Sequence, residues 1–138
     1  DSRTIEDQVP IELKHKILFL GKIKDVESIM NISDIGVLCT YTEGIPNSIL
    51  EFMALKKPVI ICGGGGSVEL IDNNVNGYLL HTGDFDGLGQ KISFLLGNVE
   101  ISLKMGGKSH EIVKNKFNIE KMALNYIDHY KSFKKNIN

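Results

Sequence analysis

Residues 35–62, IGVLCTYTEGIPNSILEFMALKKPVIIC, decide the fold class of this chain. Two apolar runs within it, Ile35–Cys39 and Pro58–Cys62, are typical of buried strands. Between them, a Gly/Pro loop is followed by an amphipathic run that predicts a helix at about residues 47–56. Because a strand, a helix and a second strand follow one another, the stretch predicts two parallel strands joined by a crossover helix.

The same alternation continues on both sides of this stretch. Two more strands are expected at Lys16–Gly21 and Gly77–Leu80, and three more helices at about 25–32, 67–73 and 84–96. The predicted fold class is therefore α/β, a Rossmann-like parallel sheet with helices on both faces. Because such sheets bind ligands beyond the carboxyl ends of their strands, the loops of interest are 21–25, 40–47 and 62–67.

The chain after residue 97 is expected to be helical, with an irregular joint at Asn98–Gly107. Its last helix carries an apolar stripe made of Ile119, Met122, Ala123, Tyr126, Ile127, Tyr130 and Phe133. We expect this stripe to pack on its own domain, and docking onto a second domain is the alternative. Three lysines near the end, Lys131, Lys134 and Lys135, are interpreted as a solvated tail, with a membrane-surface patch as the weaker alternative.

The N-terminal part is short for a fold of this type. Only Asp1–Lys16 precede the first predicted strand, whereas an open doubly wound sheet usually has about six strands. We therefore interpret residues 1–138 as a single domain that is incomplete at its N-terminal side. Residues 1–97 form its Rossmann-like part and residues 98–138 its C-terminal helices.

The composition argues against several classes of protein. The chain is 42% hydrophobic and 24% charged with a formal net charge of −1, so it lacks the basic excess of nucleic-acid-binding proteins. No apolar run reaches the ~18 residues of a membrane-spanning helix, and we expect a cytoplasmic protein. Cys39 and Cys62 each end an apolar run without metal-ligand spacing, so both are expected to be buried, reduced thiols.

Two glutamates flank the Gly/Pro loop: Glu43 is expected on the loop and Glu51 in the first turn of the next helix. Ser48 and Glu51 match the S-x-x-E capping box, in which both side chains satisfy free backbone amides. The alternative is a ligand site, because the amides of Asn47 and Ser48 at a helix start attract phosphate and carboxylates accept hydrogen bonds from sugar hydroxyls. Phosphate, ribose and sugar together describe a nucleotide sugar.

Four consecutive glycines, Gly63–Gly66, follow the second strand of the opening stretch. They match neither the phosphate-binding P-loop nor the dinucleotide fingerprint. The loop either turns tightly without a ligand or lies directly against one, because glycine allows close backbone approach. Ser67 and Glu69 either cap the next helix or contact the same ligand.

Several short blocks of the sequence follow one another in a familiar order. The blocks are Asp34–Leu38, Glu43–Asn47, Glu51–Ala54, Pro58–Ile60, Gly65–Gly66, Glu69–Ile71 and Asn76–Gly77. They resemble the C-terminal, donor-binding domain of GT-B glycosyltransferases, specifically the retaining family 4, whose E-x7-E motif corresponds to Glu43 and Glu51. The resemblance is specific over about residues 17–96 and looser to Phe133.

The resemblance implies a nucleoside-diphosphate-sugar donor bound between two Rossmann-like domains. Asn47 and Ser48 would bind the distal phosphate, Glu51 the ribose, and Glu43, as the catalytic residue, the donor sugar. The loop around Ile23 would line the base. The family resemblance further implies a hexosyltransferase-type reaction with retention, without a cofactor or a metal ion.

The sequence departs from the family in two respects. The family's Arg and Lys that neutralise the diphosphate belong to a first βα unit that is absent here, and Lys22 and Lys24 do not occupy those positions. The N-terminal acceptor domain is absent as well. We therefore expect a fragment, inactive alone, of an enzyme of polysaccharide or glycolipid biosynthesis, with peripheral membrane contact as the alternative to a purely cytoplasmic location. A non-catalytic GT-B-like binding module and a sugar-nucleotide epimerase are the alternatives.

Overall fold

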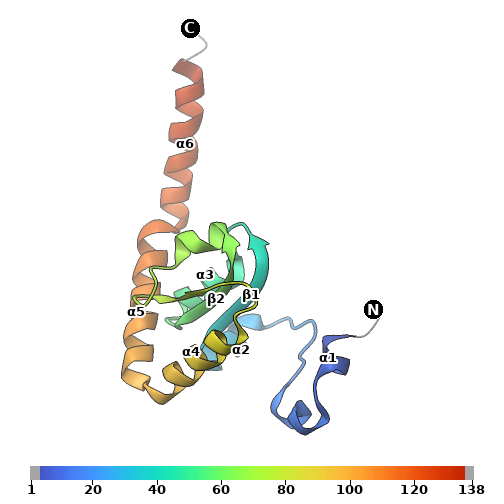
Figure 1. The fold of residues 1–138 in the computed structure, drawn as a ribbon. Coiled ribbons are helices and arrows are strands. Elements are labelled where there is room, and N and C mark those ends of the chain that lie inside the picture. Colours follow the sequence, from blue (N-terminus) through green and yellow to red (C-terminus); the bar gives the residue numbers. More distant parts are fainter. Residues whose placement is uncertain (1–3, 136–138) are drawn as a thin grey trace.

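The structure, a computed structural model, describes residues 4–135, with side chains for residues 4–133 (Figure 1). Its sheet has three parallel strands, in the order β1 (Gly36–Glu43), β2 (Val59–Gly65) and β3 (Gly77–Leu80). The α-helices are α1 (Ile5–Gln8), α2 (Val26–Ile32), α3 (Asn47–Ala54), α4 (Phe85–Gly97), α5 (Val99–Lys116) and α6 (Ile119–Lys135), and two 3-10 helices are η1 (Ile11–Lys16) and η2 (Gly66–Leu70). The predicted α/β class, parallel sheet and helical C-terminus are confirmed.

Helices cover both faces of the sheet because the central strand β2 is apolar on both sides. Val59 and Ile61 pack in one buried cluster with α3, whereas Ile60 packs in a second cluster with α4 and α5. This alternation follows from the strand geometry, in which successive side chains point to opposite faces. All three side chains are completely buried, and each contributes about 1.5–3 kcal/mol to folding.

Strands β1 and β2 both extend beyond their predicted ends at Cys39 and Cys62. The register pairs Cys39 with Cys62 and then Thr42 with Gly64, so β1 contains one residue more than β2 over this interval. The extra residue is a β-bulge, which bends the bulged strand and increases its twist. The bulge therefore sets the direction in which β1 approaches the loop before α3.

The glycine run after Cys62 is mostly strand rather than the predicted loop. Gly63 has φ +148° and Gly65 has φ +78°, both of which glycine adopts more readily than other residues. A Cβ atom at Gly63 would overlap with the carbonyl oxygen of Thr40, and one at Gly65 with that of Glu43. The glycines thus let the backbones of β1 and β2 come together beyond the bulge.

Helix α5 is unbroken from Val99 to Lys116, so the predicted irregular joint at Asn98–Gly107 is wrong. The change of direction is confined to Asn98, which lies between α4 and α5. Gly106 is buried, and a Cβ atom there would overlap with the backbone carbonyl of Lys56. Glycine in this helix therefore serves close packing against the α3–β2 connection and does not interrupt the helix.

A buried polar network fixes α5 to the turn before β3. The Asn76 side chain accepts the amide of Asp72 at 2.6 Å and donates to the carbonyl of Leu70 at 2.8 Å. The Ser109 hydroxyl of α5 donates to the backbone carbonyl of Asn76 at 2.5 Å. Asn76 and Ser109 are fully buried and lose their hydrogen bonds to water on folding. The three hydrogen bonds within the protein compensate for that loss.

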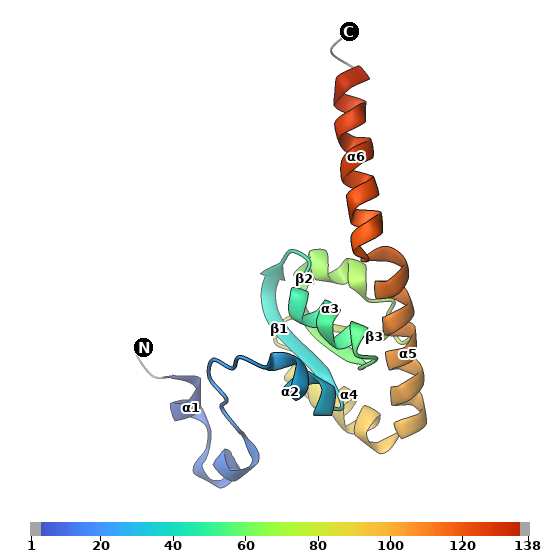
Figure 2. The same ribbon diagram turned by 180° about the vertical axis from the view of Figure 1, so that it is seen from behind.

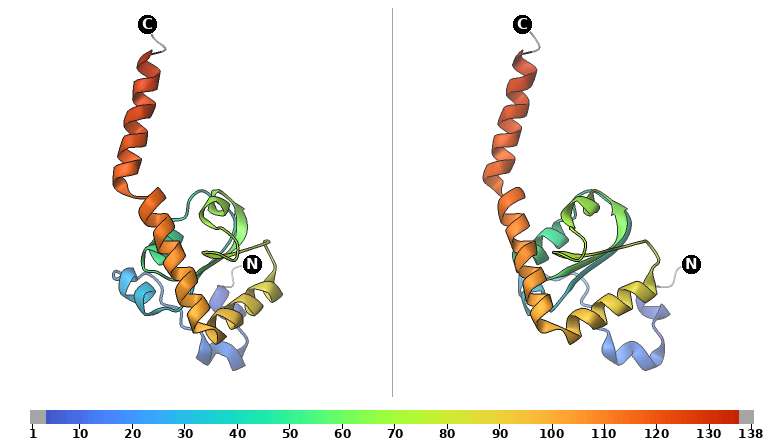
Figure 3. Two further views of the ribbon diagram at one scale, coloured as in Figure 1. Left: turned by 90° about the vertical axis from the view of Figure 1, so that its left-hand side faces the viewer. Right: turned by 60° about the vertical axis from the view of Figure 1, so that its left-hand side comes forward.

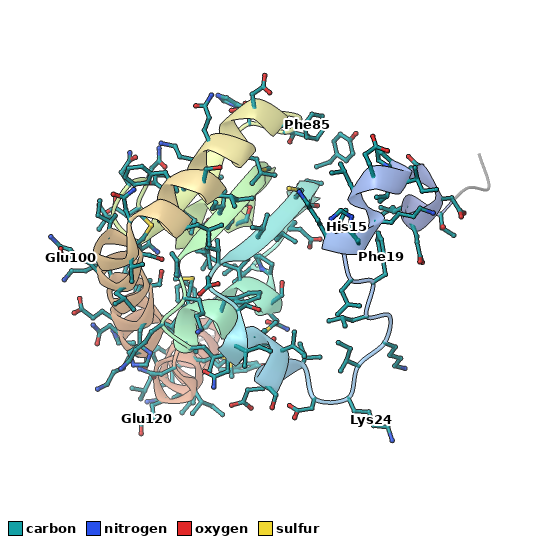
Figure 4. All side chains as sticks on the ribbon, turned by 90° about the horizontal axis from the view of Figure 1, so that it is seen from below. His15, Phe19, Lys24, Phe85, Glu100 and Glu120 are labelled. Atoms are coloured by element: carbon teal, nitrogen blue, oxygen red, sulfur yellow. The ribbon has the colours of Figure 1, made fainter. Side chains whose placement is uncertain are left out.

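Residues Lys16–Gly21 do not form the predicted buried strand. Lys16 ends η1, residues 17–20 are irregular, and Leu18 is 79% exposed. A strand requires a neighbouring strand for its hydrogen bonds, and within residues 4–135 none pairs with this segment. Figure 4 shows His15 and Phe19 on the N-terminal segment, which lies to one side of the sheet. An apolar run alone therefore did not suffice to predict a strand.

Helix α6 extends away from the sheet beyond the end of α5 (Figures 1 and 3). Every side chain from Ile119 to Phe133 is exposed, so the expectation that its apolar stripe packs on its own domain is wrong. One side of α6 borders the body from Met122 to His129, where Met122 and Tyr126 line a groove of about 590 Å³ with Ile45 and Leu50. Lys131 is exposed, as expected, and the side chains of residues 134 and 135 lie outside the described residues.

Candidate functional site

The carboxyl ends of β1 and β2 lie side by side. Glu43 is the last residue of β1 and pairs in register with Gly65, so its predicted place on a loop is wrong. The strand reaches this far because the glycines of β2 allow pairing beyond the bulge. The loop after Glu43 also contacts the start of η2, because a Cβ atom on Gly66 would lie 3.1 Å from the backbone of Gly44. The exposed carboxylate of Glu43 is therefore anchored at the junction of two loops.

Helix α3 begins without a side-chain cap. Pro46 is the N-cap residue, and its carbonyl accepts the amides of Ile49 at 3.2 Å and Leu50 at 3.3 Å. No hydrogen bond is recorded for the amides of Asn47 and Ser48 within the described part of the chain. The capping box of Ser48 and Glu51 is not formed, because Pro46 occupies the position that Ser48 would need. Two free amides at a helix start remain available to an anion.

Glu51 lies in the second turn of α3, not in the first turn as expected, and it is exposed. It lines a cavity of about 400 Å³ between α3 and the start of α2. Lys24, Asp25 and Glu27 line the same cavity, together with the apolar side chain of Met30. A cavity with carboxylates, one ammonium group and an apolar wall can accept hydroxyl groups and hold a ring, and its size falls within the usual range for small ligands.

One of these polar groups already has a structural task. The Asp25 side chain caps α2, because it accepts the backbone amide of Ser28 at 3.1 Å and the Ser28 hydroxyl at 2.7 Å. The hydroxyl bond, followed by the amide bond, lowers the pKa of the Asp25 carboxyl. Asp25 is therefore ionised near neutral pH, and Lys24 is the cation on the same cavity wall.

Among the expected site residues, Glu51 alone lines the cavity within the described part of the chain. Asn47 and Glu51 share one face of α3, since residues four apart lie above one another on a helix. Ile23 is half-buried and directly precedes Lys24, so the loop expected to line the base leads into the cavity. Glu43 lies outside the set of residues that line it.

Asp25 and Glu27 are not among the site residues expected from the sequence, although Asp25 lies in the loop 21–25. The available signal was the Asp25-x-x-Ser28 spacing, which marks a helix start. In Figure 4, Lys24 lies on the loop that leads from the N-terminal segment to α2.

Ser67, for which two roles were open, has a structural one. It is fully buried, and its hydroxyl donates to the carbonyl of Gly64 at 2.8 Å, which closes the turn from β2 into η2. Glu69 is exposed, and η2 has no side-chain cap. The expected helix at 67–73 is replaced by this shorter 3-10 helix.

The described residues contain neither a metal-binding cluster nor a membrane-spanning helix. Within residues 4–135, no three His, Cys, Asp or Glu side chains are grouped so that they could hold a metal ion. None of the helices in this part of the chain combines the length and hydrophobicity needed to cross a bilayer.

Comparison with known proteins identifies the family. The family model described as glycosyl transferases group 1 matches residues 1–98. The chain belongs to the group 1 glycosyltransferases. Among the curated relatives, N-acetyl-alpha-D-glucosaminyl L-malate synthase of Bacillus anthracis is 32% identical over 116 residues, which covers 84% of the chain and 30% of the relative. An Escherichia coli relative, UDP-Gal:alpha-D-GlcNAc-diphosphoundecaprenol alpha-1,3-galactosyltransferase, is 30% identical and covers 83% of the chain and 29% of the relative.

Solved structures of similar fold include glycosyltransferases. A glycosyltransferase from Rickettsia africae has a TM-score of 0.83 and 29% identity, covering 91% of the chain and 34% of that protein. Anabaena HepE in complex with UDP-glucose has a TM-score of 0.82 at 23% identity, covering 88% of the chain and 34% of HepE, and it supports the fold alone. The chain thus spans about a third of the length of these proteins.

Proposed function

We propose that this chain is the donor-binding part of a glycosyltransferase that transfers a sugar from a nucleoside-diphosphate sugar to an acceptor. The observation that carries the proposal is the uncapped start of α3, whose free amides lie one turn before Glu51 and its cavity. Membership of the group 1 family supports transferase chemistry. The complex of HepE with UDP-glucose supports a nucleotide-sugar ligand for this fold.

Each proposed contact follows from the chemistry of the group that makes it. The amides of Asn47 and Ser48 bind the distal phosphate, with the dipole of α3 favouring its negative charge. Glu51 accepts the ribose hydroxyls in the cavity, and the loop around Ile23 lines the base. Glu43 accepts hydroxyls of the donor sugar and acts as the catalytic residue at the end of β1.

The proposed reaction is of the retaining, family 4 type and uses no metal ion. The leaving diphosphate gains negative charge as the glycosidic bond breaks, and the amides of Asn47 and Ser48 stabilise that charge in the transition state. Further positive charge comes from parts of the enzyme outside this chain, which also bind the acceptor.

We place the enzyme, as a proposal, in polysaccharide or glycolipid biosynthesis in the cytoplasm. Its relatives include the E. coli galactosyltransferase named above and the capsular polysaccharide glycosyltransferase CapM of Staphylococcus aureus. A protein with a lipid-linked acceptor would touch the membrane peripherally.

The test uses the full-length protein that contains this chain. Glu43→Gln and Glu51→Gln keep the shape of each side chain but remove its charge, so each is expected to lower donor turnover by at least about tenfold, a loss of about 1.4 kcal/mol. Glu100→Gln, on α5 and apart from the strands in Figure 4, is the matched control with unchanged turnover. Unchanged turnover in both site variants, with unchanged circular dichroism, would refute the proposal.

The 138-residue chain offers a second test by calorimetry. We expect it to bind UDP, GDP or ADP only weakly, because the cations that neutralise the diphosphate lie elsewhere. Tight binding by this chain alone would contradict that part of the proposal.

A further inference from the structure

The two cysteines of the chain are direct neighbours in the sheet. Cys39 of β1 and Cys62 of β2 are register partners, so their side chains point to the same face. Adjacent strands lie ~4.8 Å apart, which is within the Cα separation of about 4.4–6.8 Å found across disulfides. Both cysteines line one cavity of about 180 Å³, together with Asp84 and Phe85 at the start of α4.

The two thiols differ in accessibility. Cys39 is exposed, so the expectation that both cysteines are buried is wrong for it, because β1 is an edge strand and β2 is central. Cys62 is only 4% exposed. Burial, followed by a hydrogen bond with the Cys39 thiol, raises the pKa of Cys62 to about 12, and the negative charge of Asp84 adds to the shift. Both cysteines are free in the structure.

We propose that Cys39 and Cys62 form a reversible cross-strand disulfide, which makes this thiol pair an oxidative modification site on the sheet. The proposal rests on the shared register position, the shared face and the access to Cys39. It goes beyond the proposed transferase function and does not depend on it.

The oxidant required is a small-molecule disulfide such as glutathione disulfide. The Cys39 thiolate attacks one sulfur of that disulfide, which forms a mixed disulfide and releases one glutathione thiolate. The Cys62 thiolate then attacks the Cys39 sulfur, closes the cross-strand bond and releases the second glutathione thiolate. The two cysteine protons end on the two released glutathiones, so the protein loses two electrons and the glutathione disulfide gains them.

The position of the pair gives the bond a structural effect. Cys39 and Cys62 form the last regular register pair before the bulge in β1. The segments beyond this pair lead to Glu43 and to Gly65, where the two strands end. A covalent bond would fix the spacing of the strands at the base of both segments and restrict their movement.

The experiment incubates the folded 138-residue chain in glutathione redox buffers, quenches it with iodoacetamide under denaturing conditions, and measures intact mass. We expect the oxidised product to carry no alkyl group, no glutathione and two fewer hydrogen atoms, and to revert with dithiothreitol. The rate of closure should rise with pH from neutral to pH 9, because the burial of Cys62 raises the pKa of its thiol and the thiolate is the attacking species.

Two variants provide matched controls. Cys62→Ser should stop at the mixed disulfide of Cys39 with glutathione, whereas Cys39→Ser should leave Cys62 reduced. Wild-type protein that accumulates glutathione on Cys39, or dimers linked through Cys39, while Cys62 remains alkylatable would overturn the proposal. The assay measures no sugar transfer, so its outcome is independent of the proposed function.

Discussion

At the scale of single residues, Gly65 connects the glycine run to the candidate site. Its φ of +78° and its contact with the Glu43 carbonyl leave no room for a side chain. Gly64, one residue earlier, has open space where a Cβ atom would lie. Gly65 therefore cannot be replaced by a larger residue without strain, whereas Gly64 can. The position of Glu43 depends on Gly65.

Gly65→Ala is expected to destabilise the chain by about 2 kcal/mol or more. The alanine would have to adopt a positive φ and would overlap with the backbone of β1, which cannot move as a flexible side chain can. Gly64→Ala is the matched control, with a neutral or slightly stabilising effect. Urea unfolding curves of both variants would check this, and equal stabilities would contradict it.

The buried thiol of Cys62 makes stability depend on alkaline pH. Its pKa rises from an ordinary 9.0 to about 12 on folding, so the folded state holds the proton more tightly than the unfolded state. This contribution is fully present below pH 9 and is lost as the pH rises to about 12.

The measurement is the free energy of unfolding between pH 8 and pH 11 under reducing conditions. We expect the wild type to lose more stability over this range than Cys62→Ala, in which the thiol is absent. Parallel curves for the two proteins would show that burial of Cys62 does not perturb its proton affinity.

At the scale of elements, α5 holds the molecule together. It contributes to the buried clusters on both faces of the sheet, through Met105 on one side and through Ile112 and Val113 on the other. Figure 3 shows it running alongside the sheet between α4 and α6. Its buried glycine and serine set how closely it approaches the α3–β2 connection and the turn before β3.

Two adjacent glycines of α5 should respond to alanine with opposite signs. Gly107→Ala has open space and should stabilise the helix by up to about 1 kcal/mol through helix propensity. Gly106→Ala has the same propensity gain but would overlap with the Lys56 carbonyl, so it should destabilise the chain. Thermal unfolding of the two variants decides the point, and stabilisation by both would contradict the close packing.

Helices and strands were predicted well from the sequence where the elements that pack against them lie within the described chain. Strand β3 matches its predicted residues, and α2 and α4 agree within one residue at each end. The prediction for residues 16–21 failed because an apolar run fits a strand only if a partner strand lies beside it. The expected joint at Asn98–Gly107 is wrong because Gly106, which would weaken an isolated helix, here permits close contact with the backbone of Lys56.

In the candidate site, too, local sequence patterns predicted the helix start but not the features that depend on tertiary structure. The spacing of Glu43, Asn47, Ser48 and Glu51 indicated a helix start, and α3 does begin at Asn47. The capping box could not be excluded from sequence, since only the backbone shows that Pro46 is the N-cap. The cavity beside Glu51 depends on the distance between α2 and α3, which no local pattern encodes.

At the scale of the whole molecule, the sheet and α2–α5 form the folded body, and the two ends of the chain extend from it. Figure 2 shows α1 to one side of the sheet and α6 above it. Among the side chains that the structure describes, neither helix contributes a buried one. The stability of the chain is therefore expected to come from residues 26–117.

A chain that ends at Asn118 should fold with nearly unchanged stability, within about 1 kcal/mol. The side chains described for α6 are all exposed, so they bury little apolar surface on folding. Removing them should therefore change the free energy of unfolding only slightly. A chain that ends at Gly97 is the control, and it should not fold, because it lacks Met105, Gly106 and Ser109. If the chain that ends at Asn118 unfolds at a much lower denaturant concentration than the 138-residue chain, the contacts of α6 at the Met122 groove stabilise the domain substantially.

The position of β1 has a consequence for handling the protein. Within the described residues its outer side pairs with no strand, so a row of backbone donors and acceptors faces solvent next to the exposed side chains of Val37 and Tyr41. Such an edge is a template onto which another extended segment can add by main-chain bonding. Concentrated samples of the isolated chain should thus be prone to edge-to-edge aggregation, and a lysine at Val37 would counteract it.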